Sequence, residues 1–190
     1  MKAGTPASVK YTYEDFLLFP EDGKRHEIID GEHYVTPSPN TKHQSVSLNL
    51  TLALGNYLRH HVIGQLFIAP FDVVLSDLDV VEPDLIYFSK ERADILTAQH
   101  IRGVPELVVE ILSPGSHKTD ELIKRKLYER FAVQEYWVVD PELDAIKVYR
   151  FTDGAFVRTA ELSAEHDDAL TTPLQPGFSV SLPDVFASPV

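Results

Sequence analysis

The stretch Pro105-Glu-Leu-Val-Val-Glu-Ile-Leu-Ser-Pro-Gly115 decides the fold of this chain. Its apolar run is typical of a β-strand that is covered on both faces. Glu110 interrupts the run, and two further apolar residues follow it before the turn at 113–115. A buried carboxylate costs several kcal/mol unless it is paired, hydrogen-bonded or bound to a metal ion. We therefore expect Glu110 to have a partner; the alternative is a strand end at which Glu110 meets water.

The composition indicates one folded domain over residues 1–190, with a loose leader at 1–10 and a tail at 173–190 that wraps the body. The 190 residues are 44% hydrophobic, which is ordinary for a globular protein. Cysteine is absent, which excludes disulfides and thiolate metal sites, so a metal ion would bind to oxygen or imidazole. The sequence has neither the apolar segment of a signal peptide nor an apolar run of membrane-spanning length. We therefore expect a cytoplasmic protein with no membrane partner.

The net charge of −12 comes from 29 acidic and 17 basic residues. This excess of acid disfavours a protein that coats nucleic acid without specificity, but it leaves room for a local basic groove. The clearest basic cluster follows the Glu110 strand and comprises Lys118, Lys124, Arg125, Lys126 and Arg130.

Short strands around one long helix are predicted for the first half of the chain. Asp30-Gly31 is a strong signal for a two-residue hairpin. Apolar residues between Thr41 and about Val62 have the spacing of one face of an amphipathic helix. The predicted elements are a short helix capped by Thr12 and ending at Phe19, strands His26–Asp30 and Glu32–Thr36, the long helix, strands Gly64–Ile68, Phe71–Leu75 and Leu85–Phe88, and a short helix capped by Ser89.

The second half of the chain predicts a parallel strand pair with a crossover helix. The order of strand, helix and strand between Glu106 and Val139 is the βαβ pattern, whereas the hairpins require antiparallel edges. The fold class is therefore α/β, with a central mixed β-sheet flanked by helices and antiparallel hairpins at its edges. The predicted elements are the Glu110 strand, a helix from about His117 to Phe131, strand Glu135–Asp140, a hairpin of Ala145–Phe151 and Ala155–Leu162, and a strand-poor tail from Pro173.

Candidate catalytic residues occur in three successive elements. Asp84 begins one strand, Glu110 lies within another, and Asp120, Lys124 and Tyr128 share one face of the following helix because they are four residues apart. Two carboxylates on neighbouring strands suit Mg²⁺ or Mn²⁺, and a nearby lysine can stabilise phosphoryl charge or orient the attacking water. Together these groups are the apparatus of metal-dependent phosphodiester hydrolysis.

Each of these features also has a simpler interpretation. Pro83-Asp84 is a common turn pair, and Asp120 with Lys124 is an ordinary ion pair on a solvated helix surface. The order of the residues along the chain favours the joint interpretation, because the successive elements that carry them would meet at one edge of the sheet.

The motifs together resemble the Uma-two family of bacterial proteins assigned as endonucleases. The similarity spans roughly residues 11–149, and its motifs are Glu27–Gly31, His43, Pro83–Leu85, Pro105–Pro114, Asp120 with Lys124 and Tyr128, and Glu135–Pro141. This resemblance implies the restriction-endonuclease-like fold, whose signature is Pro-Asp, then Asp or Glu, any residue, and Lys.

The resemblance also implies a set of site residues and partners. Asp84 and Glu110 would be metal ligands for Mg²⁺ or Mn²⁺, Glu27 would add a metal-binding or water-binding carboxylate, and DNA would be the substrate. His43 is a candidate substrate contact, and Asp120 and Tyr128 are accessory. The open alternatives are that Glu27 faces solvent on an edge strand and that His43 is a polar anchor at a helix start.

One position departs from the signature, because Leu112 stands two residues after Glu110 in place of lysine. Lys124 could return an ammonium group to the same place from the helix. Two hypotheses follow: a magnesium-dependent DNA endonuclease, and a catalytically silent binding or assembly module that kept the architecture. For the endonuclease we expect a homodimer, since cutting both strands requires two sites.

Overall fold

The computed structural model describes residues 9–36, 38–113 and 120–188 of the chain. Its main sheet has six strands in the order β11-β10-β9-β8-β6-β3. These strands are β3 Gly64–Ile68, β6 Leu85–Ser89, β8 Leu107–Ile111, β9 Glu135–Asp140, β10 Ala145–Thr152 and β11 Ala155–Ser163.

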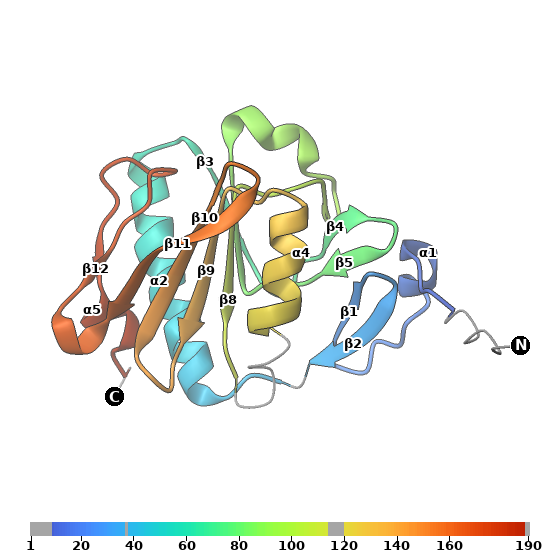
Figure 1. Ribbon diagram of the computed structural model, residues 1–190, viewed down its shortest axis with the longest axis horizontal. Coiled ribbons are helices and arrows are strands. Elements are labelled where there is room, and N and C mark those ends of the chain that lie inside the picture. The colour runs from blue at the N-terminus through green and yellow to red at the C-terminus, as the bar shows by residue number, and fades with distance from the viewer. Residues whose placement is uncertain (1–8, 37, 114–119, 189–190) are drawn as a thin grey trace, which may run out of the picture.

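Strands β8 and β9 are parallel, and the remaining pairs of this sheet are antiparallel. Helices α2 (Thr41–His60) and α4 (Arg125–Arg130) lie on opposite faces of the sheet (Figure 1). The predicted mixed sheet flanked by helices is therefore confirmed. The predicted helix start near His117 lies outside the described residues, and the described part begins with the π-helical turn η2 (Asp120–Lys124).

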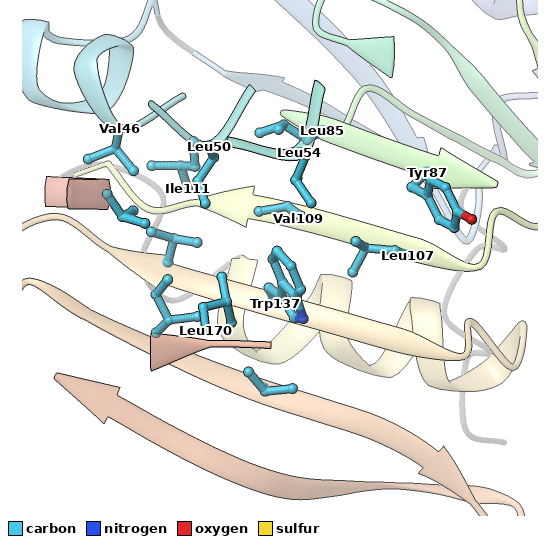
Figure 2. Packing of buried hydrophobic residues seen from close by; sticks show 14 of the residues in the cluster. Val46, Leu50, Leu54, Leu85, Tyr87, Leu107, Val109, Ile111, Trp137 and Leu170 are labelled. Atoms are coloured by element: carbon cyan, nitrogen blue, oxygen red, sulfur yellow. The ribbon is translucent and has the colours of Figure 1, made fainter. Parts of the chain in front are cut away.

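Residues of β8 alternate between two hydrophobic cores. Leu107, Val109 and Ile111 pack with α2 residues and with Trp137 (Figure 2), whereas Val108 belongs to the second core, which contains residues of α4. A strand buried on both faces has no solvated side, which explains why its apolar run is nearly continuous. Glu110 shares the α4-facing side with Val108, because side chains two residues apart point the same way.

A second sheet has five strands in the order β2-β1-β5-β4-β7. The predicted hairpin is confirmed, and Asp30 and Gly31 have φ of 50° and 73°, as a type I′ turn requires. Its strands are β1 Arg25–Ile29, β2 Glu32–Thr36, β4 Val73–Ser76, β5 Asp79–Val81 and β7 Ile101–Arg102. The two short strands β5 and β7 were not predicted, since two or three residues are too few to show a period.

The ends of the described chain add small elements. Helix α1 (Tyr13–Phe16) is capped by Thr12 and Asp15 as a capping box, but it is shorter than predicted. The two-residue strands β12 and β13 pair with each other, and α5 buries Leu182 and Val185 against the core that contains α2 residues. The remaining bounds are β12 Ala169–Leu170, β13 Val180–Ser181, α5 Leu182–Phe186, and the 3₁₀ helices η1 Lys90–Ile95 and η3 Ala164–His166.

Two smaller points complete the fold. Ser89 precedes η1, but its side chain makes no capping hydrogen bond, so the predicted cap is wrong. Within the described residues, no helix combines the length and the apolar character needed to cross a membrane.

Candidate active site

Glu110 is buried in β8, with 3% of its surface exposed. Lys124 Nζ lies 3.1 Å from Glu110 Oε1 and 3.2 Å from Oε2, and the Tyr128 hydroxyl donates to Oε1 at 2.6 Å. The alternative that Glu110 meets water at a strand end is wrong, because Leu112 N still donates to Val139 O beyond it. The buried carboxylate therefore has both a cationic and a hydroxyl partner, which offset its desolvation.

Lys124 contacts a second carboxylate, from the other sheet. Its Nζ lies 2.9 Å from Glu27 Oε1 in β1, and the same oxygen accepts from Glu82 N at 2.9 Å. Glu27 is 2% exposed, so the alternative of a solvent-facing residue on an edge strand is wrong. We call Glu27, Lys124 and Glu110 the lysine bridge.

Asp84 lies beside the lysine bridge and directly precedes β6. The antiparallel register pairs Leu85 with Val109, and its continuation sets Asp84 opposite Glu110. Asp84 Oδ2 accepts from Ile111 N at 2.7 Å, in the residue that directly follows Glu110. The two carboxylates that the sequence singled out therefore lie at adjacent positions of neighbouring strands.

Two basic side chains contact the buried Asp84 carboxylate. Arg25 Nη2 lies 2.9 Å from Oδ1, and His43 Nε2 lies 3.3 Å from Oδ2. Burial alone would raise the pKa of Asp84, but the hydrogen bond from His43 and the charge of Arg25 hold it below its ordinary value. His43 therefore contacts a candidate metal ligand, which makes its role as a polar anchor compatible with a role in the site.

Arg25 was missed by sequence reasoning, although it connects several acids. Burial lowers the pKa of its guanidinium, but the charges of Asp84 and Glu110 outweigh burial and raise it. The available signal was the spacing of Arg25 and Glu27, because residues two apart in a strand share a face. Glu82, two residues before Asp84, carries the same signal and was also missed.

The structure describes Tyr128 in full but only the backbone of Asp120. Tyr128 is fully buried, and burial together with the charge of Glu110 raises the pKa of its hydroxyl well above the ordinary value, so it remains a donor. The backbone of Asp120 opens η2, while its side chain lies outside the described part of the chain. Lys124 is the last residue of this π-helical turn. Turns of this kind occur often at functional sites.

The predicted basic cluster does not form one exposed patch. Lys124 is buried in the lysine bridge, Arg125 lies over the ring of Tyr149, and Arg130 pairs with Asp79. Lys118 lies outside the described residues. Lys124, Arg125 and Arg130 therefore contact different partners, and Lys126 is exposed.

Leu112 occupies the position of the signature lysine and is 3% exposed. It packs in the second core with Leu127, Tyr128 and Val138. The site therefore receives its ammonium group from the helix, since the strand position is apolar core.

The donor set fits a hard divalent ion that keeps most of its water. In the described part of the chain, no group of three or more histidine or acidic side chains is arranged to hold a metal ion. Magnesium, however, is usually bound by one or two carboxylates with several waters, and Asp84 and Glu110 supply two carboxylates at adjacent strand positions. The chemistry of these residues is therefore compatible with Mg²⁺ or Mn²⁺.

Residues 13–183 match the model of the family Uma2, described as "Putative restriction endonuclease". The chain belongs to the Uma2 family. This membership confirms the resemblance carried by the sequence motifs, and it covers more of the chain than those motifs do.

A solved structure shares the fold of this Uma2 protein. The crystal structure of "a putative nuclease belonging to DUF820" from Anabaena variabilis ATCC 29413 aligns with a TM-score of 0.77 and 23% sequence identity, over 92% of this chain and 97% of that one. The predicted α/β fold, a mixed sheet flanked by helices, is thereby confirmed. None of the curated proteins compared with the chain matches it.

Proposed function

We propose that this Uma2 protein is a metal-dependent DNA endonuclease that hydrolyses phosphodiester bonds. The lysine bridge is the observation that supports it most strongly. A core that served stability alone gains little from buried ion pairs, since apolar residues of similar volume are often equally stabilising. A catalytic role better explains why three carboxylates and two basic side chains are gathered here. These residues are Glu27, Asp84, Glu110, Lys124 and Arg25.

The proposed metal ligands are Asp84 and Glu110, with Glu27 joining directly or through water. The ion would be Mg²⁺ or Mn²⁺, because all three ligands are carboxylates. When bound, it would neutralise phosphate charge and make a coordinated water more acidic.

The other side chains position these groups and supply positive charge. The Lys124 ammonium group would orient the attacking water or stabilise the negative charge that develops on the phosphoryl oxygens. Tyr128 holds Glu110 in place through its 2.6 Å hydrogen bond, and Arg25 and His43 hold Asp84. Asp84 thereby stays ionised at neutral pH, as a ligand for a divalent ion must.

A catalytically silent binding or assembly module is the second candidate function. It is favoured by Leu112, which is buried where the signature has lysine. It is also compatible with the pairing of Glu27, Asp84 and Glu110 with basic side chains of the chain itself.

Cleavage of plasmid DNA in Mg²⁺ or Mn²⁺ by the purified protein tests the proposal. Asp84→Asn and Glu110→Gln should weaken metal binding, measured by calorimetry, and abolish cleavage. Lys124→Ala should leave metal binding largely intact and slow cleavage on the order of 100-fold or more, as expected for a group that stabilises the transition state. The exposed Lys126→Ala on the same helix is the matched control.

Each outcome of this experiment discriminates between the candidates. No cleavage of any DNA form by the wild type would overturn the endonuclease and favour the binding module. Cleavage that Lys124→Ala does not slow would remove Lys124 from the mechanism.

A homodimer is part of the same proposal. Two active sites are required to cut both strands, and closed two-fold pairing is the commonest way to provide them. Light scattering of the purified protein at micromolar concentration should give twice the mass of the 21.4 kDa chain. A monomer would remove the dimer without affecting the single-site chemistry.

A further inference from the structure

A pocket of about 240 Å³ lies directly beside the candidate site. Its wall is formed by the start of β1 and the two residues before it, by Thr36 at the end of β2, and by Ser38, Pro39, Pro70 and Glu82. Arg25 belongs to both places, because it lines the pocket and its Nη2 lies 2.9 Å from Asp84 Oδ1. A group bound in the pocket would therefore be one side chain away from a proposed metal ligand.

The lining of the pocket combines two kinds of polar group. Lys24 and Arg25 provide positive charge, and Thr36 and Ser38 are hydroxyl residues of the lining, all of which suit a phosphate. Lys24 Nζ also lies 3.1 Å from Asp22 Oδ2, so a bound phosphate would compete with that carboxylate for it. Glu82 is an acceptor, and in its ionised form it would oppose a bare anion. Its position is held by Arg25, whose Nη1 donates to Glu82 O at 3.0 Å and whose Nε lies 3.7 Å from Oε2.

This mixture matches a ligand that carries an anionic group at one end and an N–H donor at the other. Inorganic phosphate has only the first. A nucleotide has both, because its phosphate faces cations while the amino group of a base can donate to a carboxylate, as cytosine does to Glu or Asp. The pocket is also much larger than a single phosphate requires.

We infer that this pocket is a subsite for one nucleotide of the substrate strand, next to the phosphate that is cut. Lys24 and Arg25 receive its phosphate, and Glu82 accepts a hydrogen bond from its base. The inference rests on the proposed nuclease function and names the residues that would give it base preference. Lys24 and Glu82 are then binding residues that do not take part in the chemical step.

Titration of the isotopically labelled, metal-free protein with dCMP and with inorganic phosphate, followed by NMR, tests the subsite. In the wild type, dCMP should bind about fivefold or more tightly than phosphate, given the usual discrimination of one base contact. Its chemical-shift changes should centre on Gly23, Ser38 and Glu82. Glu82→Gln should reduce the preference for dCMP over phosphate to within about twofold. Lys24→Gln should weaken the binding of both ligands. Lys90→Gln, an exposed cation beyond the other end of β6, is the control.

A plasmid cleavage assay of the same preparations separates this inference from the proposed function. If dCMP and phosphate bind equally, or shift residues away from the pocket, while the wild type cuts DNA, the subsite is wrong and the nuclease stands. If dCMP binds as expected but no cleavage occurs, the subsite stands and the nuclease falls. If neither binding nor cleavage is seen, both are overturned.

Discussion

Lys124 Nζ lies 2.9 Å from Glu27 Oε1 in the five-stranded sheet and 3.1 Å from Glu110 Oε1 in the six-stranded sheet. One buried ammonium group thus joins two carboxylates that belong to different sheets. It compensates the charge of both carboxylates, which are almost fully buried. The lysine bridge is therefore a structural contact between the sheets as well as the centre of the candidate active site.

Replacing Lys124 with methionine should lower the free energy of unfolding by about 3–5 kcal/mol at neutral pH, because it leaves two buried carboxylates without their shared cation. Urea denaturation monitored by Trp137 fluorescence measures the change. Lys126→Met, on the exposed side of the same helix, should change stability by less than about 0.5 kcal/mol. Equal effects of the two substitutions would mean that the bridge does not stabilise the fold.

Tyr128→Phe should cost roughly 1–3 kcal/mol, because it removes the hydroxyl that donates to Glu110 and keeps the buried ring. The ring is fully buried, so the substitution isolates the hydrogen bond from the packing. The same denaturation experiment reports the loss. A stability equal to that of the wild type would show that Glu110 finds another donor at no cost.

Glu82 should make the metal-free protein less stable as pH rises from about 4.5 to 7. Burial raises the pKa of its carboxyl from 4.5 to about 7 in the folded protein. Within that range the folded state holds a proton that the unfolded state has released, so stability falls with rising pH. Glu82→Gln cannot titrate, and the decline should be smaller in this variant by roughly 1–3 kcal/mol. The free energy of unfolding of the wild type and of Glu82→Gln is measured at several pH values in the presence of a chelator. Parallel curves of the two proteins against pH would contradict the prediction.

Leu112→Lys tests whether the signature position can take back the ammonium group. Alone, it should destabilise the protein by several kcal/mol, since it adds a charge to the packed core that also contains Leu127 and Tyr128. Combined with Lys124→Leu, the loss should be smaller than the sum of the single losses by about 1 kcal/mol or more. A double-mutant cycle of unfolding free energies gives this coupling. Strict additivity would show that the two positions cannot replace each other.

Local patterns in the sequence were sufficient for the main elements. The continuous apolar run around Glu110 predicted a strand covered on both faces, and Asp30-Gly31 predicted the first hairpin, because both signals depend on residues close together in the chain. The cost of a buried charge also required that Glu110 have a partner before any partner was known. Short strands such as β5 and β7 were not predicted, because they form by pairing with neighbouring strands and carry no local pattern of their own.

The sequence by itself predicted that Glu110 is buried, and it showed that acids precede and follow Glu110 along the chain. Only the tertiary structure decided which residues meet. The packing of the two sheets brings Glu27 to Lys124 and Arg25 to Asp84. The residues of each pair are far apart in the sequence, so no helical or strand periodicity relates them. The cost of desolvation means that each buried charged side chain needs a partner. Which side chain becomes the partner depends on chain segments that are neighbours only when both sheets have formed.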